Sequence, residues 1–338
     1  MNYRSSFFFT FLIFVVLVLG CRSADSDSIE ENTLRMKSLI KELEFEGGLL
    51  ADDLDSVAHF YSYILTKKDS TLHYGNPNPY RYGGAFSTNI PGEESNLSSI
   101  IILNSTPDRK KAELEVELTN CLDSAFVKFI KNNPLAVQIY SNSAMQVSRV
   151  YPSYDAKNII DPDIDVTQFN FYYEADMEHN PNKGLVWIPD AYVDPAGKGW
   201  ILSLLHPIYD GAELFAVLGV DYTVSDIIEH YLESQPGEFV LVNEKGDIVA
   251  GKANAIEALS LPPLKNHVYR ETVQSDNFRI SDFNLFNSKS REVRNMAQSF
   301  LLQRKGEFTF ENEPTIVKAL CVPFESIEWY LIEVIPNF

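Results

Sequence analysis

The sequence predicts an α+β protein in which a long N-terminal helix is followed by two modules, each built on an antiparallel sheet. From residue 29 to 67 apolar residues recur every three or four positions, as on the buried face of a helix. Short strand-like runs follow, and turn signals such as Asp210-Gly211 favour hairpins between them. The same order of elements begins again after residue 232. A chain of this length is enough for two domains.

The N-terminus has the pattern of an export signal. An apolar run over residues 7–19, broken only by Thr10, is too short to span a bilayer comfortably. It ends in Val18-Leu19-Gly20-Cys21, which resembles the bacterial lipobox. The resemblance implies cleavage before Cys21 and a lipid on that cysteine. The alternative is an ordinary signal peptide with a chance cysteine at the cleavage point.

Five segments follow from this reading of the sequence. We expect a signal peptide at 1–20, a flexible tether of small polar residues at 21–28 and the long helix at 29–68. A first module at 69–232 and a second at 233–338 complete the chain. The predicted location is the cell envelope, with the protein anchored by lipid to a membrane and facing the periplasm or the cell exterior.

The elements of the first module can be assigned from local signals. Pro107 opens a helix, because proline is tolerated in the first turn, and the helix stops before Pro134. The long Pro-, Asp- and Tyr-rich stretch 152–199 is expected to be functional, as such loops within a domain usually are. The predicted elements are a strand at 98–103, a helix at 107–131, strands at 136–141 and 145–151 joined by Ser-Asn-Ser, strands at 200–209 and 214–221, and a helix at 226–232.

The second module repeats this pattern on a smaller scale. Glu244-Lys245-Gly246-Asp247 predicts a hairpin turn. The predicted elements are strands at 238–243 and 248–250, a helix at 290–303, and strands at 307–311, 315–322 and 329–334.

Composition excludes some function classes. The chain has 47 acidic and 28 basic residues, a formal net charge of −19. Such a chain repels nucleic acid and anionic head groups, so neither is an expected partner. Besides Cys21 it has Cys121 and Cys321, which we expect to be two buried thiols, with a disulfide between the modules as the alternative.

No cofactor is expected. The six histidines have no metal-ligand spacing, and Asp161–Asp165 lacks the glycine and the distant glutamate of a calcium loop, so a solvated loop is expected there. Gly197-Lys198-Gly199 is not a phosphate-binding loop. No Gly-x-Ser-x-Gly elbow is present and no nucleophile stands near a base, so an enzyme is not expected.

Residues 187–223 contain an ordered set of motifs. Trp187-Ile188-Pro189-Asp190-Ala191-Tyr192-Val193-Asp194 precedes a glycine-containing turn and Trp200, and His206-Pro207-Ile208-Tyr209 and Gly219-Val220-Asp221-Tyr222-Thr223 follow. This order resembles double Cache domains, the extracytoplasmic sensor modules of chemoreceptors, histidine kinases and diguanylate cyclases. The close match covers about residues 135–232 and the element order about 30–338. The resemblance implies two PAS-like Cache modules, with the ligand in the first, membrane-distal one.

The resemblance also implies a ligand site. Arg149 and Tyr151 stand where amino-acid-binding members hold a carboxylate, although Pro152 replaces the second aromatic residue of that motif, and Tyr140 is a candidate for an upstream tyrosine. Tyr192, Asp194 and Asp221 match the residues that hold the amine, and Trp187 joins them. A guanidinium suits a carboxylate, and carboxylates with aromatic faces suit an ammonium group.

Each of these residues also has a purely structural interpretation. Asp194 forms a good turn with Pro195, and Asp221 could cap the following helix, as could Thr223 or Ser225. Arg149 could be a surface charge or pair with an acid. Trp187 and Tyr192 could be core residues.

The sequence therefore predicts a sensor lipoprotein that binds an amino acid or an amine. No signalling region is recognised after the second module, so the bound state is expected to pass to a membrane partner, a chemoreceptor, a histidine kinase or a transporter. A parallel homodimer along the long helix and a monomer both fit. The alternative is a structural or interaction lipoprotein that kept the Cache fold and lost its ligand.

Overall fold

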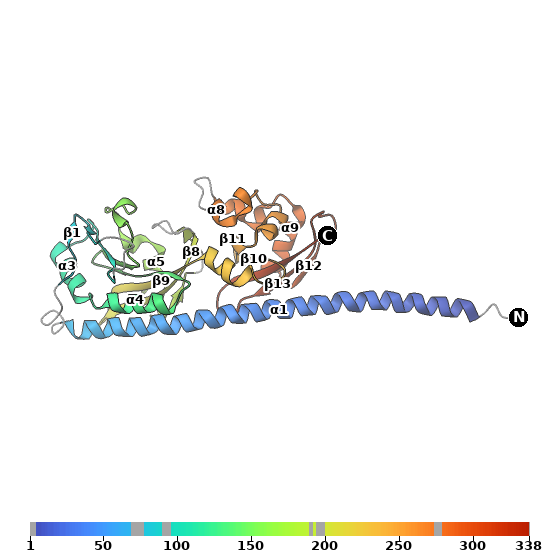
Figure 1. The fold of residues 1–338 in the computed structure, drawn as a ribbon, viewed down its shortest axis with the longest axis horizontal. Coiled ribbons are helices and arrows are strands. Elements are labelled where there is room, and N and C mark those ends of the chain that lie inside the picture. Colours follow the sequence, from blue (N-terminus) through green and yellow to red (C-terminus); the bar gives the residue numbers. More distant parts are fainter. Residues whose placement is uncertain are drawn as a thin grey trace.

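The computed structural model describes residues 5–68, 78–89, 96–188, 192–193, 200–273 and 279–337, with most side chains from residue 28 onward. Helix α1 (Ser5–Thr66) runs beneath two sheet-based modules that lie next to each other along it (Figure 1). The larger module covers the C-terminal part of α1 and the smaller module covers its middle. This arrangement confirms the predicted α+β class and the predicted long helix.

One face of α1 is buried along most of its described length. The spacing of three and four residues places these side chains on a single stripe, and Gly47 and Gly48 do not interrupt the helix. The buried residues are Met36, Leu39, Ile40, Leu50, Leu54, Val57, Ala58, Tyr61, Ile64 and Leu65. They belong to one core cluster that continues into both modules, so α1 joins the two modules through a shared core.

The segment 21–28, expected to be a flexible tether, lies within α1 in the structure. It contains no glycine or proline, so nothing in its sequence stops the backbone hydrogen bonds of the following helix from continuing through it. The side chain of Cys21 lies outside the described residues, and its lipidation remains a prediction. Among the described helices, none has both the length and the apolar character needed to cross a bilayer.

The described part of the larger module contains a nine-stranded antiparallel sheet. Its order is β1-β2-β3-β5-β4-β9-β8-β6, and β7 also pairs with β8. The strands are β1 (Tyr82–Gly83), β2 (Phe86–Ser87), β3 (Ser99–Ile102), β4 (Ala136–Ser143), β5 (Val147–Tyr151), β6 (Val186–Trp187), β7 (Tyr192–Val193), β8 (Trp200–Asp210) and β9 (Glu213–Thr223).

Two hairpins form the centre of this sheet. The predicted β8–β9 turn is confirmed, and Gly211 has the positive φ of 65° that such turns require. The β4–β5 turn lies two residues later than predicted, because the expected turn Ser-Asn-Ser continues β4. Asn142 pairs with Ser148 across the strands and accepts a hydrogen bond from its hydroxyl at 2.6 Å. The chain reverses instead at Gln146, with φ of 65°.

Both faces of the sheet are covered. Helices α1 and α4 (Leu122–Asn132) pack on one face, against residues such as Ile139, Leu204 and Val220. The other face carries a separate cluster that includes Tyr140, Val150 and Leu205 and lies against the segment 154–175. That segment contains η1 (Ala156–Asn158), η2 (Val166–Gln168) and α5 (Asn170–Tyr173). The sheet is therefore the middle layer of three.

The helix predicted at 107–131 is two helices, α3 (Arg109–Leu118) and α4. Thr119 ends α3, and its hydroxyl donates to the carbonyl of Glu115 at 2.8 Å. The same carbonyl also accepts from the backbone N–H of Thr119 at 3.0 Å, which closes the last turn of α3. The break places Asp123 in the first turn of α4, where it faces the sheet.

The smaller module repeats the pattern with a five-stranded antiparallel sheet among the described residues, in the order β11-β10-β14-β13-β12. The segment α6 (Val224–Ile227) and the π-helical turn η3 (Ile228–Leu232) lead into it. Its strands are β10 (Glu238–Asn243), β11 (Ile248–Gly251), β12 (Glu307–Thr309), β13 (Ile316–Pro323) and β14 (Trp329–Pro336). Its helical segments are α7 (Ala253–Ala258), η4 (Lys265–His267), α8 (Tyr269–Val273), η5 (Ile280–Phe283), η6 (Leu285–Asn287), α9 (Arg291–Ala297) and η7 (Gln298–Leu302).

Cys121 and Cys321 are both free thiols. Cys321 is buried in β13, as predicted, whereas Cys121 is exposed at the start of α4, so the expectation of two buried thiols is wrong for that residue. A disulfide between the modules is not formed.

Candidate ligand cavity

A cavity lies on the face of the larger sheet that is turned away from α1. Strands β3, β4, β5, β7 and β9 and the segment 154–171 line it. It holds about 600 Å³ of empty space, counting the open solvent at its mouth, of which about 80 Å³ can take the centre of a water-sized molecule. Strand alternation turns Gln138, Tyr140 and Asn142 of β4 toward it, while Ile139 turns toward α1.

Most of the cavity wall is apolar. Phe169 and Phe171 stack at 5.1 Å between ring centroids, and Phe171 meets the edge of Tyr140 at 6.2 Å. The remaining apolar lining residues are Ile101, Leu103, Val150, Ile160, Ile164 and Val166. Such a wall favours a ligand with a substantial aliphatic or aromatic part.

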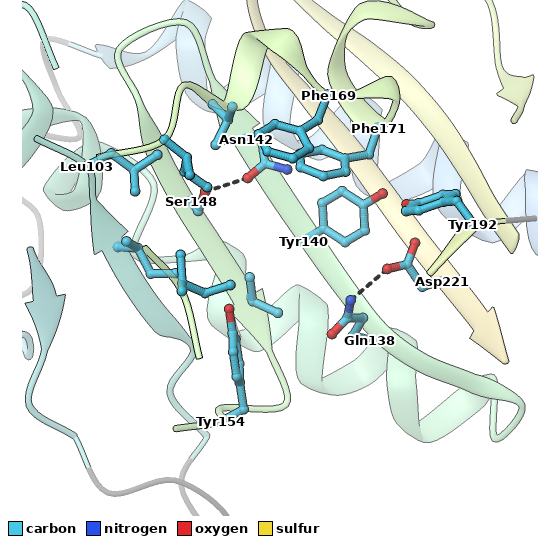
Figure 2. Close-up of a pocket in the computed structure, with 15 residues that line it drawn as sticks. Leu103, Gln138, Tyr140, Asn142, Ser148, Tyr154, Phe169, Phe171, Tyr192 and Asp221 are labelled. Carbon is cyan, nitrogen blue, oxygen red and sulfur yellow. Dashed lines mark hydrogen bonds between the residues drawn. The ribbon is translucent and has the colours of Figure 1, made fainter. Parts of the chain in front are cut away.

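The polar end of the cavity is a chain of hydrogen bonds that ends on Asp221. Asp221 is 1% exposed and accepts from Gln138 Nε2 at 2.6 Å and from Ser203 Oγ at 2.5 Å. The Tyr192 hydroxyl lies 2.8 Å from the same serine oxygen. Because a serine has one proton and gives it to Asp221, the tyrosine must donate to the serine. The network therefore holds Asp221 as a fixed acceptor next to Tyr192 (Figure 2).

Tyr140 projects into the cavity between this network and the phenylalanines (Figure 2). Its buried hydroxyl lies beside Ser203 and Tyr192 but makes no hydrogen bond of good geometry with any described residue. Burial raises the pKa of Tyr140, and the nearby Asp221 raises it further, so the hydroxyl is protonated. An unpaired buried hydroxyl is costly, which makes it a candidate partner for a bound molecule.

The structure brings together two of the residues predicted to hold an amine. Tyr192 and Asp221 both line the cavity. The alternative role of Asp221 as a helix cap is taken instead by Thr223, whose hydroxyl accepts from the backbone N–H of Asp226 at 3.2 Å. Asp194 lies outside the described residues.

The predicted carboxylate-binding residues are on the other face of the sheet. Arg149 is 2% exposed, and its Nη1 donates to Asp123 Oδ1 at 2.6 Å, while Nη2 donates to the Val116 carbonyl and the Thr119 hydroxyl, both at 3.1 Å. Burial alone would lower the pKa of Arg149, but Asp123 raises it, so the arginine is charged. The alternative of pairing with an acid is correct, and the ligand role is not supported.

Tyr151 and Trp187 also lie away from the cavity. Tyr151 follows Arg149 by two positions, so it shares its face, and it packs on the core that contains α1. Trp187 packs on the same core, with its ring 6.3 Å from that of Tyr222. Neither lines the cavity that Tyr192 and Asp221 share.

Sequence reasoning missed several lining residues. Gln138 and Asn142 were not singled out, although two amides four positions apart, and so on the same face of a buried strand, are a signal for a polar site. Phe169 and Phe171 carried no local signal beyond their place in the long loop. Asp161–Asp165 is a hydrogen-bonded loop, and among the described residues no group of three or more metal-ligating side chains occurs.

Comparison with known proteins gives matches at the level of structure only. No protein-family model matches the chain, and no curated protein matches it. The ligand-binding domain of the Campylobacter jejuni chemoreceptor Tlp3, solved with L-valine, is 14% identical, with 89% of this chain and 95% of that chain covered and a TM-score of 0.43. The domain of the Pseudomonas fluorescens chemoreceptor CtaA, solved with L-leucine, is 12% identical, with coverage of 63% and 78% and a TM-score of 0.41. The domain of the Pseudomonas aeruginosa chemoreceptor PctC, solved with GABA, is 16% identical, with coverage of 69% and 84% and a TM-score of 0.38.

The element order of this chain is the one that its sequence resemblance implies. A long helix carries first a larger and then a smaller module, each with an antiparallel sheet, and the cavity lies in the first. The sequence resemblance to double Cache domains implies this architecture, and membership of that family remains a prediction.

Proposed function

We propose that this protein is an extracytoplasmic sensor lipoprotein that binds a small amine, or an amino acid, in the cavity of its larger module. The observation that carries the proposal is the hydrogen-bond chain from Tyr192 through Ser203 to Asp221 at one end of a mostly apolar cavity. A buried carboxylate beside aromatic rings suits an ammonium group. The apolar wall suits the rest of the ligand.

Among the described lining residues none is cationic. The predicted cation, Arg149, lies on the other face of the sheet, where its guanidinium donates to Asp123. This favours an amine with an apolar body over a ligand with a free carboxylate. Binding, and not catalysis, is the role that such a site fits.

Signalling would follow from the position of the cavity. Strands β4 and β9 carry Tyr140 and Asp221 on the cavity face and core residues such as Ile139 and Val220 on the face that packs against α1. A ligand that moves these strands therefore acts on the packing of α1. With a lipid on Cys21 the protein would stay at a membrane and pass this change to a chemoreceptor, a histidine kinase or a transporter. A homodimer and a monomer both remain compatible with this role.

The second candidate is an interaction lipoprotein with a Cache fold and no ligand. The buried ion pair between Arg149 and Asp123 is the observation that favours it, since the residue predicted to hold a ligand carboxylate binds a carboxylate of the protein instead.

The test is a thermal-shift and calorimetric screen of the full-length protein with matched trios: isoamylamine, leucine and isoamyl alcohol, then phenethylamine, phenylalanine and 2-phenylethanol. A ligand at 100 times its dissociation constant stabilises the fold by about 2.7 kcal/mol. We expect the amines to bind more tightly than the alcohols, and Asp221→Asn to weaken binding at least about tenfold, as for loss of a charge-assisted hydrogen bond. Asp282→Asn, an exposed change in the smaller module, is the matched control. Absence of binding across both trios would favour the interaction lipoprotein.

A further inference from the structure

A second hollow lies on the opposite face of the larger sheet from the cavity. It is a groove between α1, the turn after α4 and the segment α6–η3 that leads into the smaller module, and it holds about 1200 Å³ of empty space with the open solvent at its mouth. We call it the junction groove. Its lining includes Glu42, Glu46 and Gly47 of α1 and the aromatic residues Trp187, Tyr222 and Tyr231.

The sequence of α1 explains why the groove is open here. At Gly47 the helix has no side chain, and a Cβ placed there would lie 3.7 Å from Cζ2 of Trp187, so the indole lies against bare helix backbone. A neighbouring hollow shares Gly47, Trp187 and Ile227 and reaches Phe324 and Trp329 of the smaller module. The junction groove therefore opens where both modules meet α1.

One end of the groove is negative. Glu42 and Glu46 are exposed, and they lie one turn apart on the same face of α1. Both act on Tyr231, whose pKa is raised first by burial and then by Glu46 and Glu42. The described lining contains no lysine or arginine, and its titratable groups besides the two glutamates and the tyrosines are limited to the exposed His230.

The rest of the groove is aromatic, with one buried polar atom. The rings of Trp187 and Tyr222 are 6.3 Å apart, with Tyr231 beside the glutamates. Tyr222 is only 8% exposed, and its hydroxyl has no hydrogen-bond partner among the described residues. Aromatic faces beside carboxylates are the usual partners of organic cations.

We propose that the junction groove is a second ligand site that takes an organic cation. The ammonium group lies between Glu42, Glu46 and the ring of Tyr231, and the apolar part of the ligand lies on Trp187 and Tyr222. The two carboxylates repel an anion, and they attract a cation more strongly than a neutral molecule of the same shape. The site is separate from the cavity, so it stands or falls independently of the proposed function.

The position of the groove gives such a ligand a role. It touches α1, the larger module and the segment that enters the smaller module at the same time. A cation bound there holds these three parts in the arrangement seen in the structure, because it has this affinity only for that arrangement.

The test uses tryptophan fluorescence of the full-length protein in non-ionic detergent, titrated with benzyltrimethylammonium and, separately, with neutral 2-phenylethanol. Trp187 lies in the groove, and no tryptophan lines the described part of the cavity, so the signal reports on the groove. We expect a saturable change with the cation that is absent in Trp187→Phe. The double variant Glu42→Gln/Glu46→Gln should bind about fivefold more weakly, as for loss of two exposed charge contacts. Glu30→Gln/Glu31→Gln, which removes the same charge from exposed positions of α1 outside the groove, should bind as the parent does.

Two further variants make the result decisive. Tyr222→Phe removes only a hydroxyl without a partner, so the fold should keep its stability while cation binding weakens. Unchanged binding in Tyr222→Phe would overturn the placement of the ligand on this residue. Asp221→Asn should leave the fluorescence titration unchanged. The proposal is overturned by no saturable change at a concentration of about 10 mM, which corresponds to negligible affinity. Equal weakening of cation binding in Glu42→Gln/Glu46→Gln and in Glu30→Gln/Glu31→Gln would also overturn it. Loss of the fluorescence change in Asp221→Asn alone would overturn it by assigning the cation to the cavity.

Discussion

Tyr140 and Gly219 lie directly opposite each other on β4 and β9, and the tyrosine ring rests on the glycine backbone. A Cβ built on Gly219 would lie 2.3 Å from Cζ of Tyr140, far inside any real carbon contact. The glycine of the Gly219-Val220-Asp221 motif therefore leaves the space in which Tyr140 reaches the cavity beside Asp221.

We predict that Gly219→Ala displaces the Tyr140 ring. It should cost about 1–3 kcal/mol of stability, the usual penalty for overpacking, and weaken ligand binding in the cavity. Urea unfolding and calorimetric titration measure the two effects. Gly184→Ala is the control, since a Cβ there meets no atom within 4 Å. Adding Tyr140→Leu to Gly219→Ala should restore stability without restoring binding, and a double variant as unstable as Gly219→Ala would show that the contact with Tyr140 is not the cause.

Arg149 holds α3 and α4 to the sheet through its buried ion pair with Asp123, which also accepts from Ser98 and Tyr80 at 2.6 Å each. We predict that Arg149→Met destabilises the protein by about 3–5 kcal/mol, because it leaves a buried carboxylate without its cation. Arg149→Met/Asp123→Leu should be less damaging than the sum of the single changes. Ligand affinity of the folded protein should persist. A stable Arg149→Met protein that no longer binds ligand would reinstate the predicted ligand role.

Glu115 on α3 gives stability a dependence on pH. Burial raises its pKa from 4.5 to about 7, although a hydrogen bond to Ser143 and the charge of Arg149 pull it down. As pH rises from 4.5 to 7 the unfolded chain loses this proton before the folded protein does, so stability falls across that interval and levels off above it.

We therefore predict that Glu115→Gln flattens this decline and makes the protein more stable than the parent at pH 8. Urea unfolding at pH 4, 6 and 8 measures it. Glu117→Gln, at an exposed position of the same helix, should keep the slope of the parent. An unchanged slope in Glu115→Gln would mean that this carboxyl is not the group responsible.

Lipid attachment is tested at Cys21. We predict that Cys21→Ser abolishes metabolic incorporation of an alkyne fatty acid and moves the protein from the membrane fraction to the soluble fraction, because the acyl chains supply the membrane affinity. Cys121→Ser, which removes an exposed thiol, should be labelled like the parent. Labelling that survives in Cys21→Ser would refute the lipobox interpretation.

Local sequence signals determined much of the fold. Gly211 and Gly246 lie in their predicted hairpins with φ of 65° and 85°. These turns were predictable because few residues other than glycine adopt a positive φ, so a glycine between two strand-like runs indicates the turn. The long helix was readable from its apolar period, and the α+β class from the order of elements. The break after Leu118 was not readable, because residues 109–132 contain no glycine or proline to signal it.

The candidate site divides in the same way. The sequence named Tyr192 and Asp221, which lie far apart along the chain and meet because β7 and β9 both pair with β8. It also named Arg149 and Tyr151, which the tertiary structure turned to the other face. Strand β5 is buried on both sides, so its pattern of apolar residues does not say which face is which. The packing of α3 and α4 on one face of the sheet decided the orientation of β5. It places the buried carboxylate of Asp123 on that face, where Arg149 pairs with it. Ser148 and Val150 therefore face the cavity on the other side.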